Sequence, residues 1–191
     1  VIWHGDTLEI DILSPASAYA VAPEKISETV TDDEGNVLIE AVAYYPVIEN
    51  PTKNPYCDTI NFDYKWDADK FIEEAKAKKE DALMLKEQMG DAFTPFVFEL
   101  TYEQTYSIWG HLSFTNHKYI NVGGVHPSKI MESRTYSVGG DVEMSVSEII
   151  DEDVLEVSLA DYVTNLFVEK LKEIAPESAD VYTADYVSEC L

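Results

Sequence analysis

The stretch KISETVTDDEGNVLIEAVAYY, residues 25–45, contains two runs of strand-forming residues on either side of the cluster DDEGN at residues 32–36. Glycine and asparagine readily adopt the positive φ angles that tight hairpin loops require, and acidic side chains favour an exposed turn. The sequence therefore predicts a β-hairpin with strands over residues 25–31 and 37–45.

The segments on either side of this hairpin predict a further strand and a long loop. Apolar and acidic residues alternate over residues 7–13, which is the pattern of a half-buried strand. Proline lacks a backbone N–H and disfavours regular pairing, so Pro46, Pro51 and Pro55 predict an irregular connection over residues 47–59.

The second half of the chain predicts a helix, a set of strands and another helix. The first helix is expected to begin at an N-cap near Asp67 and to end at Gly90. Period-two patterns over residues 96–138 predict an antiparallel meander, with a tight turn at the GGD of residues 139–141. An apolar stripe at helical spacing predicts the second helix from Leu159 to Ile174.

The element order strand, helix, strand, helix predicts an α+β fold in which two main helices pack on antiparallel sheets, without a repeated βαβ unit. Because the two halves share this plan, the sequence predicts two lobes. Residues 1–92 form a strand-hairpin-helix lobe in this interpretation. Residues 93–191 form a lobe with the antiparallel meander and the second helix.

The charge of the chain is strongly negative. Thirteen Lys and Arg against 37 Asp and Glu give a formal net charge of −24, which disfavours nucleic acid and anionic lipid surfaces as partners. The simplest interpretation is solubility, and the alternative is a cationic partner whose association depends on salt. The longest apolar stretch, residues 41–48, is far shorter than the roughly 20 residues of a membrane-spanning helix, so no membrane insertion is expected.

The sequence NVGGVHP at residues 121–127 predicts a sharply bent loop between strands. Gly123 and Gly124 allow backbone angles closed to other residues, and Pro127 fixes the direction of the exit. His126 has two interpretations. The simpler one is a structural imidazole that bonds to backbone groups of the bend, and the other is a ligand-contacting loop tip.

Catalytic and metal-binding patterns are absent from the sequence. His111 and His117 lie six residues apart in one predicted strand, about 20 Å, which is too far for a shared metal. Cys57 and Cys190 have no CxxC spacing, and they form either one long-range disulfide or two unpaired thiols. No GxSxG elbow or calcium-loop pattern occurs. We therefore expect no cofactor and no metal, and a binding domain in preference to an enzyme.

Several short motifs, in this order along the chain, resemble the paired extracytoplasmic domains of RsiV-like anti-sigma factors. The same pair of domains precedes the catalytic domain in PdaC-type peptidoglycan deacetylases. The motifs are YYPVI at residues 44–48, the pair Ile60-Asn61, GGVHP at residues 123–127, Tyr136 and Gly139. In such proteins further strands follow the last helix, whereas this sequence ends at Leu191.

The resemblance implies a non-catalytic binding or sensing domain outside the cytoplasm, secreted or anchored to the cell surface. Its implied partner is a basic protein such as lysozyme, or a peptidoglycan fragment. The alternative is an enzyme domain associated with cell-wall glycan hydrolysis or deacetylation, in which His126 acts as a general base or metal ligand. The candidate binding residues are Gly123, Gly124, His126, Pro127, Tyr45 and Pro46.

Overall fold

The computed structural model describes residues 2–4, 7–9, 19–50, 53–108, 110–124, 126–138, 143–144 and 159–174. Its elements are β1 (Ile2–His4), β2 (Thr7–Glu9), β3 (Val21–Thr31), β4 (Val37–Ile48), α1 (Pro55–Lys76), α2 (Lys79–Met89), the 3₁₀ helix η2 (Gly90–Ala92), β5 (Phe96–Ile108), β6 (His111–Asn121), β7 (Ser128–Ser137), β8 (Glu143–Met144) and α4 (Leu159–Ile174). The chain divides into two compact units, residues 1–144 and 145–191.

A six-stranded sheet with the order β3-β4-β5-β6-β7-β8 is the centre of the larger unit, and β1 pairs with β2 separately. The fold class α+β is confirmed. The sheet is antiparallel except for β4 and β5, which run parallel from the pair Ile39↔Phe96 to the pair Ala43↔Leu100. Because α1 and α2 connect these two strands, the chain contains one βαβ crossover that the sequence analysis did not predict.

The predicted hairpin is confirmed and is longer than expected. β3 and β4 pair from Val21↔Ile48 to Thr31↔Val37, and Pro46 lies inside β4 opposite Pro23. The prediction that Pro46 ends the strand is therefore wrong. Both prolines fit because β5 pairs with β4 only as far as Ala43, and because β3 lies at the edge of the sheet, so neither strand needs every backbone donor there.

The first helix begins at Pro55, well before the predicted start near Asp67. The side chain of Asn54 caps it by accepting a hydrogen bond from the Tyr56 amide at 3.1 Å. Proline at the first helical position stabilises a helix start, because that N–H would have no intrahelical partner. The predicted irregular connection over residues 47–59 is thus wrong at both ends. The single predicted helix is in fact two, because α1 ends at Lys76 and α2 begins at Lys79, and the predicted end at Gly90 is confirmed by α2, which has Gly90 as its C-cap.

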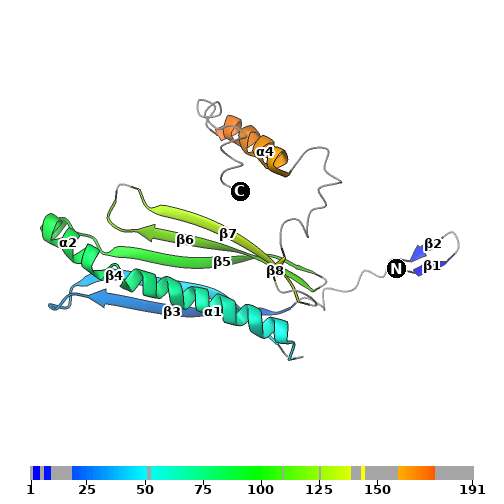
Figure 1. Ribbon diagram of the computed structural model, residues 1–191, viewed down its shortest axis with the longest axis horizontal. Coiled ribbons are helices and arrows are strands. Elements are labelled where there is room, and N and C mark those ends of the chain that lie inside the picture. Colours follow the sequence, from blue (N-terminus) through cyan, green and yellow to red (C-terminus); the bar gives the residue numbers. More distant parts are fainter. Residues whose placement is uncertain are drawn as a thin grey trace. The chain divides into compact units, whose positions relative to one another are not determined.

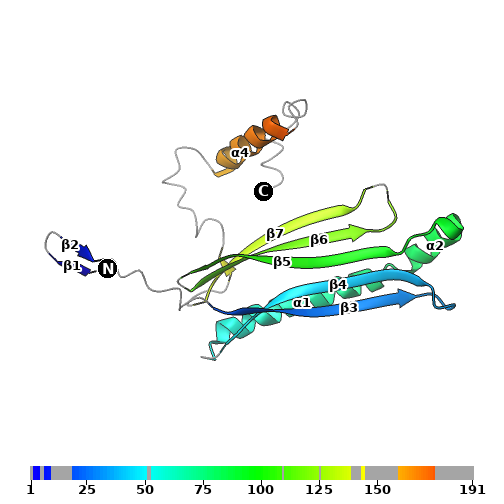
Figure 2. The ribbon, with the colours of Figure 1, turned by 180° about the vertical axis from the view of Figure 1, so that it is seen from behind.

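Helix α1 lies along one face of the sheet, and the view from behind shows the strands with neither α1 nor α2 in front of them (Figures 1 and 2). The helix buries a stripe at intervals of mostly three or four residues against the sheet, consisting of Cys57, Ile60, Tyr64, Ala68, Phe71, Ile72 and Ala75. Residues on both sides of the predicted lobe boundary near residue 92 share this sheet and this core.

Edge-to-face aromatic contacts connect α1 to the strands beneath it. The Tyr64 ring lies 5.4 Å from that of Phe114 and 5.8 Å from that of Tyr136, and the Phe71 ring lies 6.1 Å from that of Phe98. Each such pair contributes about 1 kcal/mol beyond the area it buries. The helix itself lies mainly against β4, and the long side chains of Tyr64 and Phe71 reach from it to β5, β6 and β7.

Two asparagines tie the start of α1 to the strands by polar contacts. The Asn61 side chain accepts a hydrogen bond from the Ile48 amide at 2.7 Å and donates one to the Ile48 carbonyl at 2.9 Å. The Asn54 side-chain nitrogen donates to the Val138 carbonyl at 2.9 Å. These bonds satisfy backbone groups just after β7 and at the end of β4, which β5 does not reach.

The smaller unit contributes α4, and the predicted helix from Leu159 to Ile174 is confirmed. The strand predicted over residues 7–13 is confirmed for Thr7–Glu9, and its remaining residues lie outside the described part. The turn predicted at residues 139–141 also lies outside it. Within the described residues, no helix is long and apolar enough to span a bilayer.

Replacement of Asn61 should destabilise the fold. We expect Asn61→Ala to lower the free energy of unfolding by about 2 kcal/mol, because both backbone groups of Ile48 lose their partner in a partly buried setting. Urea denaturation measures this change. The neighbouring Phe62 is 67% exposed, and Phe62→Ala should change stability by less than about 0.5 kcal/mol. Equal effects of the two substitutions would contradict the assigned role.

The hydroxyl of Tyr64 is expected to contribute nothing to stability. Burial raises the pKa of Tyr64 far above its ordinary value, and no described residue forms a hydrogen bond of ordinary geometry with its hydroxyl, although the hydroxyl of Tyr136 lies close enough to interact electrostatically. Tyr64→Phe should therefore leave the free energy of unfolding unchanged or raise it by up to about 1 kcal/mol. A loss larger than that in the same urea experiment would show that the hydroxyl has a stabilising partner.

Candidate functional site

One end of the sheet brings together the hairpin tip at residues 32–36, helix α2, and the turn between β6 and β7. Lys86 of α2 forms an ion pair with Asp32 of the tip. Leu85, which precedes Lys86 in α2, packs closely on Gly123. A Cβ atom on residue 123 would overlap Leu85 Cδ2. Helix α2 therefore holds two loops that are far apart in the sequence.

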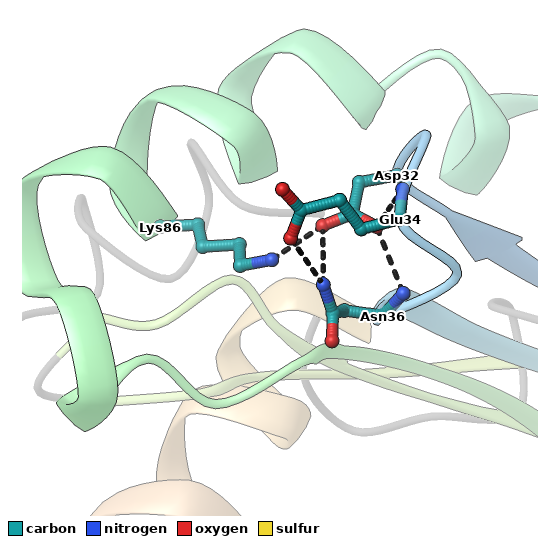
Figure 3. Close-up of polar contacts among 4 residues, drawn as sticks. All are labelled: Asp32, Glu34, Asn36 and Lys86. Atoms are coloured by element: carbon teal, nitrogen blue, oxygen red, sulfur yellow. Dashed lines mark hydrogen bonds and ion pairs between the residues drawn. The ribbon is translucent and has the colours of Figure 1, made fainter.

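The hairpin tip is organised around the carboxylate of Asp32 (Figure 3). Its Oδ1 accepts hydrogen bonds from the backbone amides of Glu34 at 3.0 Å and Asn36 at 2.8 Å. Its Oδ2 accepts from the Asn36 side chain at 3.0 Å and from Lys86 Nζ. The contact with Lys86, followed by that with Asn36, holds the pKa of Asp32 well below its usual range. Asp32 is thus an anchor of the loop that is charged at neutral pH.

A depression of 640 Å³ lies between the tip and α2. Besides Asp32, the acidic residues around it are Asp33, Glu34, Glu80 and Glu87. All four are exposed, and none of them forms an ion pair with another described residue. The bases around it are Lys79 and Lys86, of which Lys86 already neutralises Asp32. The depression therefore has a surplus of carboxylates available to a cationic group.

The predicted bent loop at residues 121–127 is confirmed, and Gly123 has a structural reason. Its φ angle is 77°, and its amide donates to Asn121 Oδ1 at 3.1 Å. Gly124 has neither a positive φ angle nor a close neighbour that would exclude a side chain. His126 is exposed and Pro127 is half-buried, while Val125 lies outside the described residues. The His126 side chain makes no hydrogen bond within the described part.

The structure does not bring Tyr45 and Pro46 to this loop. Tyr45 is 8% exposed and Pro46 is fully buried, so both belong to the packing of β4. The register of β4, β5 and β6 places Asn121 level with Glu40, so Tyr45 lies about 20 Å from the loop. The six predicted binding residues therefore form two separate groups.

No constellation for metal binding appears within the described ranges. His111 begins β6 and His117 lies six residues further along it. Among the described residues, no three His, Cys, Asp or Glu are arranged to hold an ion. Cys57 is fully buried, and burial raises the pKa of its thiol. Cys190 lies outside the described residues, so the disulfide and the free thiols both stay predictions.

Sequence reasoning missed the residues of α2 that build this end of the sheet. The sequence assigned no role to Lys86, whose side chain is 29% exposed and paired with the hairpin tip. Nothing in a single sequence indicates this pairing, since charge patterns along a helix report only neighbours three or four residues away.

Comparisons with known proteins agree with this fold. The family described as Deacetylase PdaC matches residues 33–129. None of the curated proteins matches the chain. Neither the family match nor the solved structures distinguish an RsiV-like ectodomain from other proteins with such domains, so that part of the resemblance stays a prediction.

Two solved structures of the DUF3298 family are similar to the chain. The protein from Bacteroides fragilis is 11% identical with a TM-score of 0.59, and the alignment covers 91% of this chain and 74% of that one. A protein from Pseudomonas aeruginosa is 13% identical with a TM-score of 0.42, covering 83% of this chain and 69% of that one. The first of these likenesses supports the fold alone.

The family match begins in the hairpin tip, continues through β4, both helices, β5 and β6, and ends at the start of β7. It includes Asn54, Asn61 and the loop at residues 121–127, which are the features that position the helices on the sheet. Because this match spans just over half of the sequence, the chain belongs to the family described as Deacetylase PdaC.

Proposed function

We propose that this chain is a non-catalytic binding domain that acts outside the cytoplasm and binds a cationic protein such as lysozyme. The observation that carries the proposal is the depression of 640 Å³ between the hairpin tip and α2, with its four carboxylates outside any ion pair of the described residues. A lysine or arginine side chain of a partner has the size and charge to enter it.

Electrostatic attraction favours such a partner both during its approach and at contact. The net charge of −24 attracts a cationic protein from afar and accelerates the encounter. At contact, Asp33, Glu34, Glu80 and Glu87 offer hydrogen-bond acceptors to ammonium or guanidinium groups. Each exposed pair contributes only about 0.2–1 kcal/mol, so several of them together are needed for useful affinity.

The depression also has the rigidity that binding requires. The Asp32 carboxylate accepts hydrogen bonds from Glu34 and Asn36 within the hairpin tip, and it accepts another from Lys86 of α2 (Figure 3). Because both walls are held in place before a partner arrives, little ordering entropy is lost on binding.

The alternatives have less support from the geometry. A peptidoglycan fragment with neutral and anionic groups would meet a surplus of carboxylates here. For the enzyme alternative, no carboxylate of the described residues contacts His126, and the depression between the hairpin tip and α2 does not include it. A general base needs such a partner or an adjoining pocket for substrate.

Lysozyme binding should depend on the acids of this depression and on salt. We expect Glu80→Gln/Glu87→Gln to weaken binding about 5-fold at roughly 50 mM salt, because two attractive contacts are removed. Raising the salt to roughly 300 mM should weaken binding by the unsubstituted chain at least about 10-fold, because exposed charges are screened. Isothermal titration calorimetry measures both effects.

The matched control is Glu49→Gln/Glu103→Gln, which removes the same two charges from exposed residues elsewhere on the unit. It should weaken binding by less than about 2-fold. No binding at either salt concentration would refute the proposal of a lysozyme partner. Equal weakening by both double variants would show that total charge, and not this depression, governs the interaction.

A further inference from the structure

A second depression, of 240 Å³, lies on the helix-bearing face of the sheet beside α1. Its floor includes Asn116 and Lys118 of β6 and Arg134 of β7, and its wall includes Asp67 and Lys70 of α1. It exists because α1 lies mainly against β4 and leaves β6 and β7 open beside it, and Figure 1 shows β6 and β7 extending away from the helix.

Opposite charges alternate around this groove. Arg134 Nη1 lies 2.8 Å from Asp67 Oδ2, and Lys118 Nζ lies 2.7 Å from Glu132 Oε2. On α1, a looser pair joins Lys70 to Glu74 at 3.8 Å. A guanidinium has five N–H donors and an ammonium has three, so Arg134 and Lys118 retain donors for a ligand. The carboxylates likewise retain acceptor sites.

Asn116 supplies the second observation. Its side chain is 6% exposed and lines the groove, yet it makes no hydrogen bond with any described residue. Among the described residues, the buried side-chain atoms without a hydrogen-bond partner belong to Tyr64, Ser107 and Tyr136 and not to Asn116, so the Asn116 amide is open to the groove. It is therefore available to bond to a molecule in the groove.

We propose that this groove binds a small zwitterion with an amide bond, of the size of a dipeptide. A carboxylate of the ligand pairs with Arg134 or Lys118, its ammonium pairs with Glu132 or Glu74, and its amide bonds to Asn116. The volume of 240 Å³ lies below the range of about 300–1,000 Å³ typical of drug-sized ligands. This site is separate from the acidic depression and does not depend on the function proposed for it.

The charge balance of the groove selects this class of ligand. Its three cations equal its three anions, whereas the whole chain carries a net charge of −24. A purely anionic ligand is repelled by the molecule as a whole. A purely cationic ligand binds more favourably at the acidic depression than in this groove. A zwitterion has no net charge to be repelled and matches both signs locally.

Titration of the full chain with alanyl-alanine tests the proposal, with the side-chain amide signals of Asn116 followed by NMR. We expect saturable shifts with a dissociation constant of about 1 mM, in line with roughly −4 kcal/mol for so small a ligand. N-acetyl-alaninamide has the same size without charges, and it should bind at least about 10-fold more weakly. No saturable shift at concentrations up to about 50 mM, or equal binding of the two compounds, would overturn the proposal.

Two variants localise the site. Asn116→Ala, followed on the backbone amide signals of β6, should weaken alanyl-alanine binding at least about 10-fold, because the hydrogen bond to the amide of the ligand is lost. If Asn116→Ala does not fold, Lys118→Gln/Glu132→Gln removes the partly exposed pair and should weaken binding to the same extent, followed on the Asn116 signals. The matched control is Lys65→Gln/Asp69→Asn, a pair of α1 outside the groove, which should leave affinity unchanged. Unchanged affinity in a folded groove variant would refute this location, whatever the outcome with lysozyme.

Discussion

The position of α1 on the sheet is the constraint on which the rest of the structure depends. Asn61 bonds both backbone groups of Ile48, and Asn54 bonds the carbonyl of Val138, so the first turns of the helix are tied to the end of β4 and to the chain just after β7. Apolar burial alone would allow α1 to slide along the sheet, because it has no directional preference. The amide bonds set one position, and the aromatic contacts of Tyr64 then follow from it.

From this position, the course of the helix produces both depressions. Because α1 lies mainly along β4, a groove stays open beside it over Asn116 of β6. Beyond α1, the chain turns into α2, which reaches the hairpin tip through Lys86 and the loop between β6 and β7 through Leu85. One element thus joins two loops and forms a wall of the acidic depression. The two depressions differ in charge, one with a surplus of carboxylates and one balanced.

The comparisons support the fold and the family more than the function. The family match includes the hairpin tip, both helices and the loop with Gly123, but it transfers no ligand to particular residues. Several motifs behind the sequence resemblance have structural roles. Pro46 is buried in β4, Asn61 caps the end of that strand, and Gly123 leaves room for Leu85. Functional contacts are therefore to be sought on exposed side chains around these motifs.

The sequence by itself determined the local structure: the hairpin around residues 32–36, the strands from Phe96 to Ser137, the helix end at Gly90 and the helix α4. These depend on turn chemistry and on periodicity, which are properties of neighbouring residues. It misplaced the start of α1, because Pro55 favours a helix start as much as a loop. Only the tertiary structure decided that β4 and β5 run parallel, that Lys86 reaches Asp32, and that Asn116 faces a groove. Such contacts join residues far apart in the chain, and no spacing or composition within one sequence specifies which distant groups will meet.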